Sequence, residues 1–249
     1  MNSRQIAIVA AVVFAIASPA LQATGDVGLS AAEFSRAGDG TLRAAGYAFS
    51  IWSVIYAGLM AFAVYQALPA HRDDPLVEAV AKPAVAAITG TGLWIWASAL
   101  DARWLTVVII VASAAALTLG LIGAARTVGR PDLKARAFVW WPLSLMAGWL
   151  TIASAINILT VLTAEGLLAG ATQAAAFAGV VAVLIVALLV ERTPRLTVHA
   201  IPIAWGLVAV WVAEKASKSD VASLALGSAG VIAAYGLWQS RPRVSNARR

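Results

Sequence analysis

The chain contains no cysteine and only two histidines among its 249 residues. Without cysteine it has no disulfide, no thiolate nucleophile and no Cys-ligated metal or iron–sulfur site. Two histidines that lie far apart in the sequence also disfavour a His-rich metal site. We therefore predict no metal centre.

Charge is scarce as well. Only 12% of the residues are charged, against about 25% in a typical soluble domain, and 61% are hydrophobic, with a mean hydropathy of +0.84. So little polar surface cannot cover a water-soluble particle, which makes lipid the solvent. Only helices and closed barrels satisfy their backbone in lipid, and the unbroken apolar runs at 107–124 and 174–190 favour helices over alternating barrel strands.

Eight segments approach the length of about 20 mostly apolar residues that a transmembrane helix needs. We place them at residues 5–23, 46–68, 82–100, 104–124, 139–163, 170–190, 198–214 and 221–239. The predicted fold class is therefore all-α, a polytopic bundle of eight transmembrane helices.

The basic residues are divided unevenly between the two sides of such a bundle. With eight spans, 13 of the 18 Lys and Arg lie on the side that holds both termini, and 5 lie on the other side. Because short cytoplasmic loops carry the excess of Lys and Arg, both termini are predicted to be cytoplasmic. This rule explains the net charge of +6 without nucleic acid as a partner, and a basic tail at 241–249 is placed to contact anionic lipid.

The first span has a second interpretation. Arg4, the apolar stretch after it and the small residues at 18–20 or 21–23 also resemble a signal peptide with its cleavage site. We favour a retained helix, because the apolar stretch is long for a signal peptide. Cleavage would leave seven spans in the same orientation.

The interiors of the predicted spans contain no Asp, Glu, Lys or Arg. Pumps and ion-coupled transporters normally place ionisable groups within the membrane, and acid–base enzymes need titratable side chains. The sequence therefore disfavours both classes, and we expect neither enzymatic activity nor an obligatory cofactor. It favours a protein that binds or passes an apolar, aromatic small molecule.

Ten tryptophans are many for this length, and the second span places aromatic residues on one helical face. Phe49, Trp52, Tyr56 and Met60 recur there at helical spacing. Such a surface suits a flat apolar ligand, although ordinary helix packing uses the same residues.

The fifth span carries a second pattern of this kind. Trp149, Ala153 and Asn157 follow one another at intervals of four and share a face. The small Ala153 leaves space beside the indole, and the Asn157 amide supplies one polar group that would orient a ligand.

These residues resemble the tryptophan-rich sensory protein family, TspO, which includes the mitochondrial translocator protein. The family's second span runs approximately W-x-F-G-P-V-W-x-x-L-Y, and the segment YAFSIWSVIY at 47–56 is similar to it. The W-x3-A-x3-N pattern of the family's fifth span is matched at 149–157, and the third-span tryptophans resemble Trp94 and Trp96.

The resemblance covers residues 1–163 and implies a five-helix membrane domain with a pocket beneath the loop that joins the first two spans. Family members bind tetrapyrroles such as protoporphyrin and haem, some bind sterols, and many are homodimers. A location in the bacterial cytoplasmic membrane is expected. The residues implied to contact the ligand are Phe49, Trp52, Tyr56, Trp94, Trp149, Ala153 and Asn157.

In this chain the corresponding loop is residues 24–45, rich in glycine and placed on the outward side to act as a flexible lid. Its Arg36 and Arg43 would meet the acidic groups of a porphyrin through charge-assisted hydrogen bonds, unless they are simply solvated. A porphyrin-degrading photochemical activity, which needs aromatic and not acid–base residues, also stays open.

Residues 164–240 contain the last three spans, predicted as an appended C-terminal module. Two rival interpretations use all eight spans. One is a transporter of a neutral or amphipathic solute, with helices broken at Pro142 and Pro202. The other is an assembly subunit of a larger membrane complex, which contacts its partners through small residues such as Gly170, Ala174 and Ala178.

Overall fold

The computed structural model describes residues 1–193 and 196–240. Arg195, counted above among the basic residues, and the predicted basic tail at 241–249 lie outside the described residues. Within them the chain forms helices and no strand, and eight helices are long and apolar enough to cross a membrane. The predicted fold class, a polytopic helical bundle, is confirmed.

The described helices follow the predicted spans closely. They are α1 (Ser3–Thr24), α2 (Ala31–Arg36), η1 (Gly46–Ser50), α3 (Ile51–Ala67), η2 (Pro69–His71), α4 (Pro75–Ala99), α5 (Arg103–Thr127), α6 (Leu133–Ala135), η3 (Arg136–Trp140), α7 (Trp141–Ala164), α8 (Thr172–Glu191), η4 (Thr197–His199), α9 (Ala200–Glu214) and α10 (Ser219–Ser240). Gly46–Ala67, Leu133–Ala164 and Thr197–Glu214 are each one continuous span. The short helix α2 was not predicted.

The third span begins at Pro75, earlier than the predicted residue 82. Proline is favoured at the first helical position, and the Asp74 carboxylate caps the helix by accepting hydrogen bonds from the backbone N–H groups of Leu76 (2.8 Å) and Val77 (3.3 Å). The charged Glu78 interrupts the hydropathy of this first turn, which is why hydropathy alone places the start too late.

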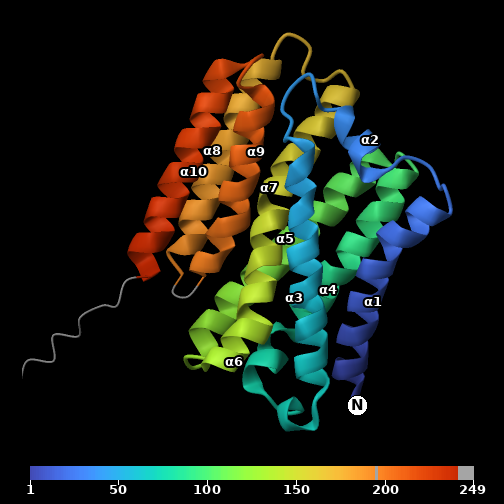
Figure 1. Cartoon of the computed structure of the whole chain (residues 1–249), viewed down its shortest axis with the longest axis vertical. Coiled ribbons are helices and arrows are strands. Elements are labelled where there is room, and N and C mark those ends of the chain that lie inside the picture. The colour runs from blue at the N-terminus through green and yellow to red at the C-terminus, as the bar shows by residue number, and fades with distance from the viewer. Residues whose placement is uncertain (194–195, 241–249) are drawn as a thin grey trace, which may run out of the picture.

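Consecutive spans run antiparallel, so the connections gather at the two ends of the bundle (Figure 1). Helices α8, α9 and α10 lie on one side of α7, and α1 and α4 lie on the other. The closest packing joins α4 to α5, α9 to α10 and α1 to α4, while α7 contacts α3, α5, α8 and α9. Helix α7 therefore connects the first four spans to the last three.

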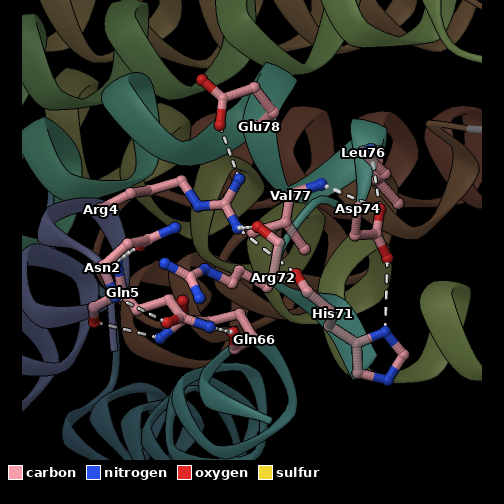
Figure 2. Close-up of polar contacts among 10 residues, drawn as sticks. All are labelled: Asn2, Arg4, Gln5, Gln66, His71, Arg72, Asp74, Leu76, Val77 and Glu78. Atoms are coloured by element: carbon pink, nitrogen blue, oxygen red, sulfur yellow. Dashed lines mark hydrogen bonds and ion pairs between the residues drawn. The ribbon is translucent and has the colours of Figure 1, made fainter. Parts of the chain in front are cut away.

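The N-terminal end of α1 is tied to the connection between α3 and α4 by hydrogen bonds (Figure 2). Arg4 forms an ion pair with Glu78 (2.6 Å) and donates to the backbone carbonyl of Arg72 (2.6 Å). Beside it, Gln5 and Gln66 each donate from the side-chain amide to the other's backbone carbonyl, at 2.7 and 3.2 Å. Because lipid supplies no hydrophobic force between helices, hydrogen bonds such as these help to hold α1 against its neighbours.

Helix α7 approaches the start of α9 closely because Gly148 has no side chain. A β-carbon there would collide with the backbone carbonyl of His199 and with Pro202. Pro142 directly follows the π-helical segment η3 inside the continuous span Leu133–Ala164, and Pro202 follows the 3-10 segment η4 inside the span Thr197–Glu214. The helical geometry changes near both prolines, but neither span divides into two separate helices, and the transporter interpretation stays a prediction.

The small residues suggested as partner contacts do not pack inside the chain. Ala174 and Ala178 are exposed on α8, and Gly170 lies in the preceding connection with a φ of +76°. They add nothing to the core of this bundle.

Substitution of Gly148 by alanine is expected to destabilise the protein by about 1–3 kcal/mol, because the backbone carbonyl of His199 cannot move aside as a flexible side chain would. Thermal unfolding in detergent measures the effect. Gly123→Ala in α5, where a β-carbon meets nothing within 4 Å, is the control and should be neutral or stabilising. Equal stability of the two variants would contradict the close contact of α7 with α9.

Candidate ligand-binding site

A cavity of about 910 Å³ opens between helices α3, α4, α5 and α7 and the loop above them. Its walls include every residue that the sequence singled out for ligand contact, namely Phe49, Trp52, Tyr56, Trp94, Trp149, Ala153 and Asn157. The two loop arginines predicted beside them, Arg36 and Arg43, line it as well. Met60, which shares the face of Trp52 in the pattern, is 50% exposed and is not among the lining residues.

The aromatic side chains form a continuous wall where α3 faces α7. The rings of Trp52 and Trp149 meet edge to face, with centroids 6.4 Å apart and planes at 83°. Phe49 meets Trp149 in the same manner at 6.4 Å, and Tyr56 lies 5.2 Å from Trp52 with its ring tilted by 32°. Such contacts hold the rings in fixed orientations, so a flat ligand would find ring faces already in place.

Two of these tryptophans keep their polar hydrogen available. Among the described residues, no hydrogen bond is formed by the indole N–H of Trp52 or Trp149 or by the hydroxyl of Tyr56. By contrast, the indole of Trp205, outside the cavity, donates to the backbone carbonyl of Ala48 at 3.2 Å. Trp149 is only 5% exposed, but its indole nitrogen keeps some accessible surface and is not a buried donor without a partner.

Asn157 is engaged by its neighbours. Its carbonyl oxygen accepts a hydrogen bond from the Trp94 indole at 2.9 Å, and its amide donates to the Thr106 hydroxyl at 2.9 Å. The Thr106 hydroxyl donates in turn to the backbone carbonyl of Arg103 at 2.6 Å. Asn157 therefore positions Trp94 across three helices, and a direct bond to a ligand would have to use its second amide hydrogen.

The loop above the cavity contains the short helix α2. Ser30 and Glu33 form a capping box at its start, and hydrogen bonds from the Ser30 side chain and backbone lower the pKa of Glu33. The next residue, Phe34, is only 3% exposed and packs edge to face on Trp94, with centroids 5.9 Å apart. The loop predicted as a lid, residues 24–45, thus contains an ordered helix whose Phe34 ring packs on Trp94, and the N–H of Leu29 also donates to the carbonyl of Ala99 at 3.0 Å.

The second half of the loop is held by α9. The backbone N–H of Arg43 donates to the Glu214 carboxylate at 3.0 Å, and the Arg43 guanidinium donates to the backbone carbonyl of Ala213 at 3.0 Å. Farther along, the N–H of Ala45 donates to the carbonyl of Ala209 at 3.0 Å. Val212 and Ala213 themselves line the cavity, so the last three spans contribute to its wall.

The described side chains around the cavity do not include a cluster of metal-ligating residues. Within residues 1–193 and 196–240, no group of three or more His, Asp or Glu side chains is placed to hold a metal ion. The lining residues include neither His nor Met, which are common axial ligands of haem iron.

A family model described as TSPO-like protein matches residues 5–238 of the chain. The chain belongs to the TSPO-like family. Because the match continues past residue 163, it covers the last three spans of this TSPO-like protein as well as the first five. Neither the curated proteins nor the solved structures include a match to the chain. The division into a five-helix domain and a C-terminal module stays a prediction.

Sequence reasoning overlooked Phe34, Thr106 and Glu214. The Ser30-x-x-Glu33 capping box was a readable sign of a helix in the loop, and it would have pointed to Phe34 as the buried face of that helix. Thr106 and Glu214 carried no such sign, because each acts on a residue far away in the sequence.

Replacing Phe34 by alanine should free α2 from Trp94 and open the lid, because a buried aromatic ring is worth about 3–5 kcal/mol in packing. Trypsin should then cut after Arg36 faster in the detergent-solubilised variant. Val27→Ala, in the same loop at a residue that is 37% exposed, is the control and should be cut at the wild-type rate. Identical rates for both variants would show that Phe34 does not anchor the lid.

Proposed function

We propose that this TSPO-like protein binds a flat aromatic molecule with acidic groups, of the porphyrin class, in the cavity beneath α2. The proposal places the protein in tetrapyrrole handling or in signalling that depends on tetrapyrrole binding. Trp52, Tyr56 and Trp149 would stack on the ligand, and Ala153 would leave room for it.

The observation that carries the proposal is the convergence of the aromatic residues. Side chains from α3, α4 and α7, distant in sequence, line one cavity of about 910 Å³, within the range of about 300–1,000 Å³ typical of small-molecule sites. The walls are largely apolar, and among the described lining residues Arg36 and Arg43 are basic while Asp39 is acidic. An apolar aromatic body with acidic substituents complements both features.

The free donors support the same ligand class. The indole hydrogens of Trp52 and Trp149 would meet acceptor atoms within the ligand, since they find none among the described residues. A metal-free porphyrin needs no axial ligand, whereas haem iron would find Tyr56 among the described lining residues as a side chain of a type that ligates it.

We further propose a location in the bacterial cytoplasmic membrane with both termini cytoplasmic. The positive-inside rule supports this orientation, because the described connections nearest the N-terminus hold more Lys and Arg than those at the lid end. The cavity then opens toward the outer face of the membrane.

Protoporphyrin IX should bind the detergent-solubilised protein and quench its tryptophan fluorescence. The double variant Trp52→Ala, Trp149→Ala should bind at least about tenfold more weakly, because two aromatic contacts, one with a ring face and one with a ring edge, worth about 0.5–1.5 kcal/mol each, are removed with the area that they bury. Trp104→Ala and Trp238→Ala, at side chains 52% and 58% exposed, serve as controls. Unchanged affinity in the double variant would contradict the cavity as the binding site.

The orientation is testable with single cysteines, because the natural chain has none. Ala70→Cys lies at the N-terminal end of the bundle, and Ala169→Cys, at an exposed residue, lies at the lid end. A membrane-impermeant maleimide applied to intact spheroplasts should label residue 169 and spare residue 70 until the membrane is permeabilised. The reverse pattern would overturn the proposed orientation.

A further inference from the structure

Glu214, at the end of α9, is a buried carboxylate at the edge of the cavity. Its side chain is only 1% exposed, and it accepts hydrogen bonds from the backbone N–H of Arg43 (3.0 Å) and from the Ser217 hydroxyl (3.0 Å). The Lys218 ammonium lies 3.4 Å away and also donates to the carbonyl of Thr41 at 2.8 Å. A carboxylate so deeply buried is costly unless each of its bonds is made.

These bonds fix one cavity arginine and not the other. Arg43 is held at its backbone by Glu214 and at its guanidinium by the carbonyl of Ala213, with Nε 3.8 Å from the carboxylate. Arg36 is 66% exposed, and its one described partner, Glu33 at 3.7 Å, is itself 48% exposed. An exposed pair of that kind contributes little order. Arg43 is itself 44% exposed, but both its backbone and its guanidinium are bonded to α9, so it is the better ordered of the two cations at the cavity mouth.

We infer that Glu214 is a positioning residue, through which α9 holds Arg43 at the mouth of the cavity so that the site selects ligands bearing a carboxylate. The inference rests on the proposed binding function and gives the last three helices a part in it. Glu214 does not touch the ligand. It fixes the loop backbone at Arg43, and the Ala213 carbonyl engages one end of the guanidinium and leaves the other end for an acidic group.

The charges around Glu214 are also compatible with an acidic ligand. Arg43 and Lys218 both face Glu214, so this trio carries one negative and two positive charges, while Asp39 adds a second carboxylate to the cavity lining. A ligand carboxylate would meet the positive charge of the trio at Arg43. Preorganised charged donors of this kind favour an anion more than a mobile side chain does, because less conformational freedom is lost on binding.

The test compares protoporphyrin IX with its dimethyl ester, which has the same ring but no free carboxylate. The measured quantity is the ratio of the two dissociation constants in detergent. We expect the wild type to prefer the acid by at least about tenfold, the value of one hydrogen bond between charged groups. Arg43→Gln should reduce the ratio to about one and leave ester binding within about twofold.

Glu214→Leu, which removes the acceptor for the Arg43 N–H, should likewise lose most of the preference while ester binding persists. Glu214→Gln keeps an acceptor oxygen at the same place and should retain the preference, as a conservative rescue. Lys215→Gln removes a neighbouring charge that instead lies over the Trp211 ring, 5.0 Å from its centroid, and should behave as the wild type.

The outcomes separate the two proposals. A wild-type ratio in Glu214→Leu, or a Glu214→Gln ratio as low as that of Arg43→Gln, overturns the positioning role while porphyrin binding stands. Should Glu214→Leu fail to fold, the Glu214→Gln and Arg43→Gln ratios decide alone. If the wild type binds neither porphyrin, the proposed function fails, and the inference fails with it.

Discussion

The close approach of α7 to the start of α9 is the contact on which the positions of the last three helices depend. Lipid provides no hydrophobic force between helices, so close packing at small residues has to supply the attraction. Gly148 of α7 lets this helix lie directly against the carbonyl of His199. One turn farther along, Gly206 of α9 leaves room for the side chain of Ile152 from α7. From this contact α9 runs to the lid end of the bundle, where Glu214 meets the loop.

The cavity is bounded by an aromatic wall and by an ordered loop. In the wall the rings contact one another edge to face, and the loop is held by Phe34 at one point and by α9 at another. No hydrogen bond is described for the indole N–H groups of Trp52 and Trp149, which are the donors that the proposed ligand would meet.

Much of this could be predicted from the sequence. Hydropathy located all eight spans, because a helix that crosses lipid needs an uninterrupted apolar length. Helical spacing placed Trp52 beside Tyr56 on one helix face and Trp149 beside Ala153 on another. The start of α4 was misplaced because Glu78 lowered the local hydropathy in a turn that a cap at Asp74 stabilises.

The engagement of Asn157 by Trp94 and Thr106, and of Arg43 by Glu214, could not be predicted from a single chain. Both depend on which helices become neighbours, and periodicity says nothing about that. For the same reason Asn157, which the pattern suggested as a ligand contact, is found holding another side chain.

The most direct measurement is an experimental density map of the protein prepared with protoporphyrin IX. Binding in the cavity predicts a flat density against the aromatic wall of Trp52, Tyr56 and Trp149, with a carboxylate within hydrogen-bonding distance of Arg43. A porphyrin seated instead on the lipid-facing surface, with the cavity beneath α2 collapsed or filled by side chains, would contradict the assignment of this cavity as the binding site.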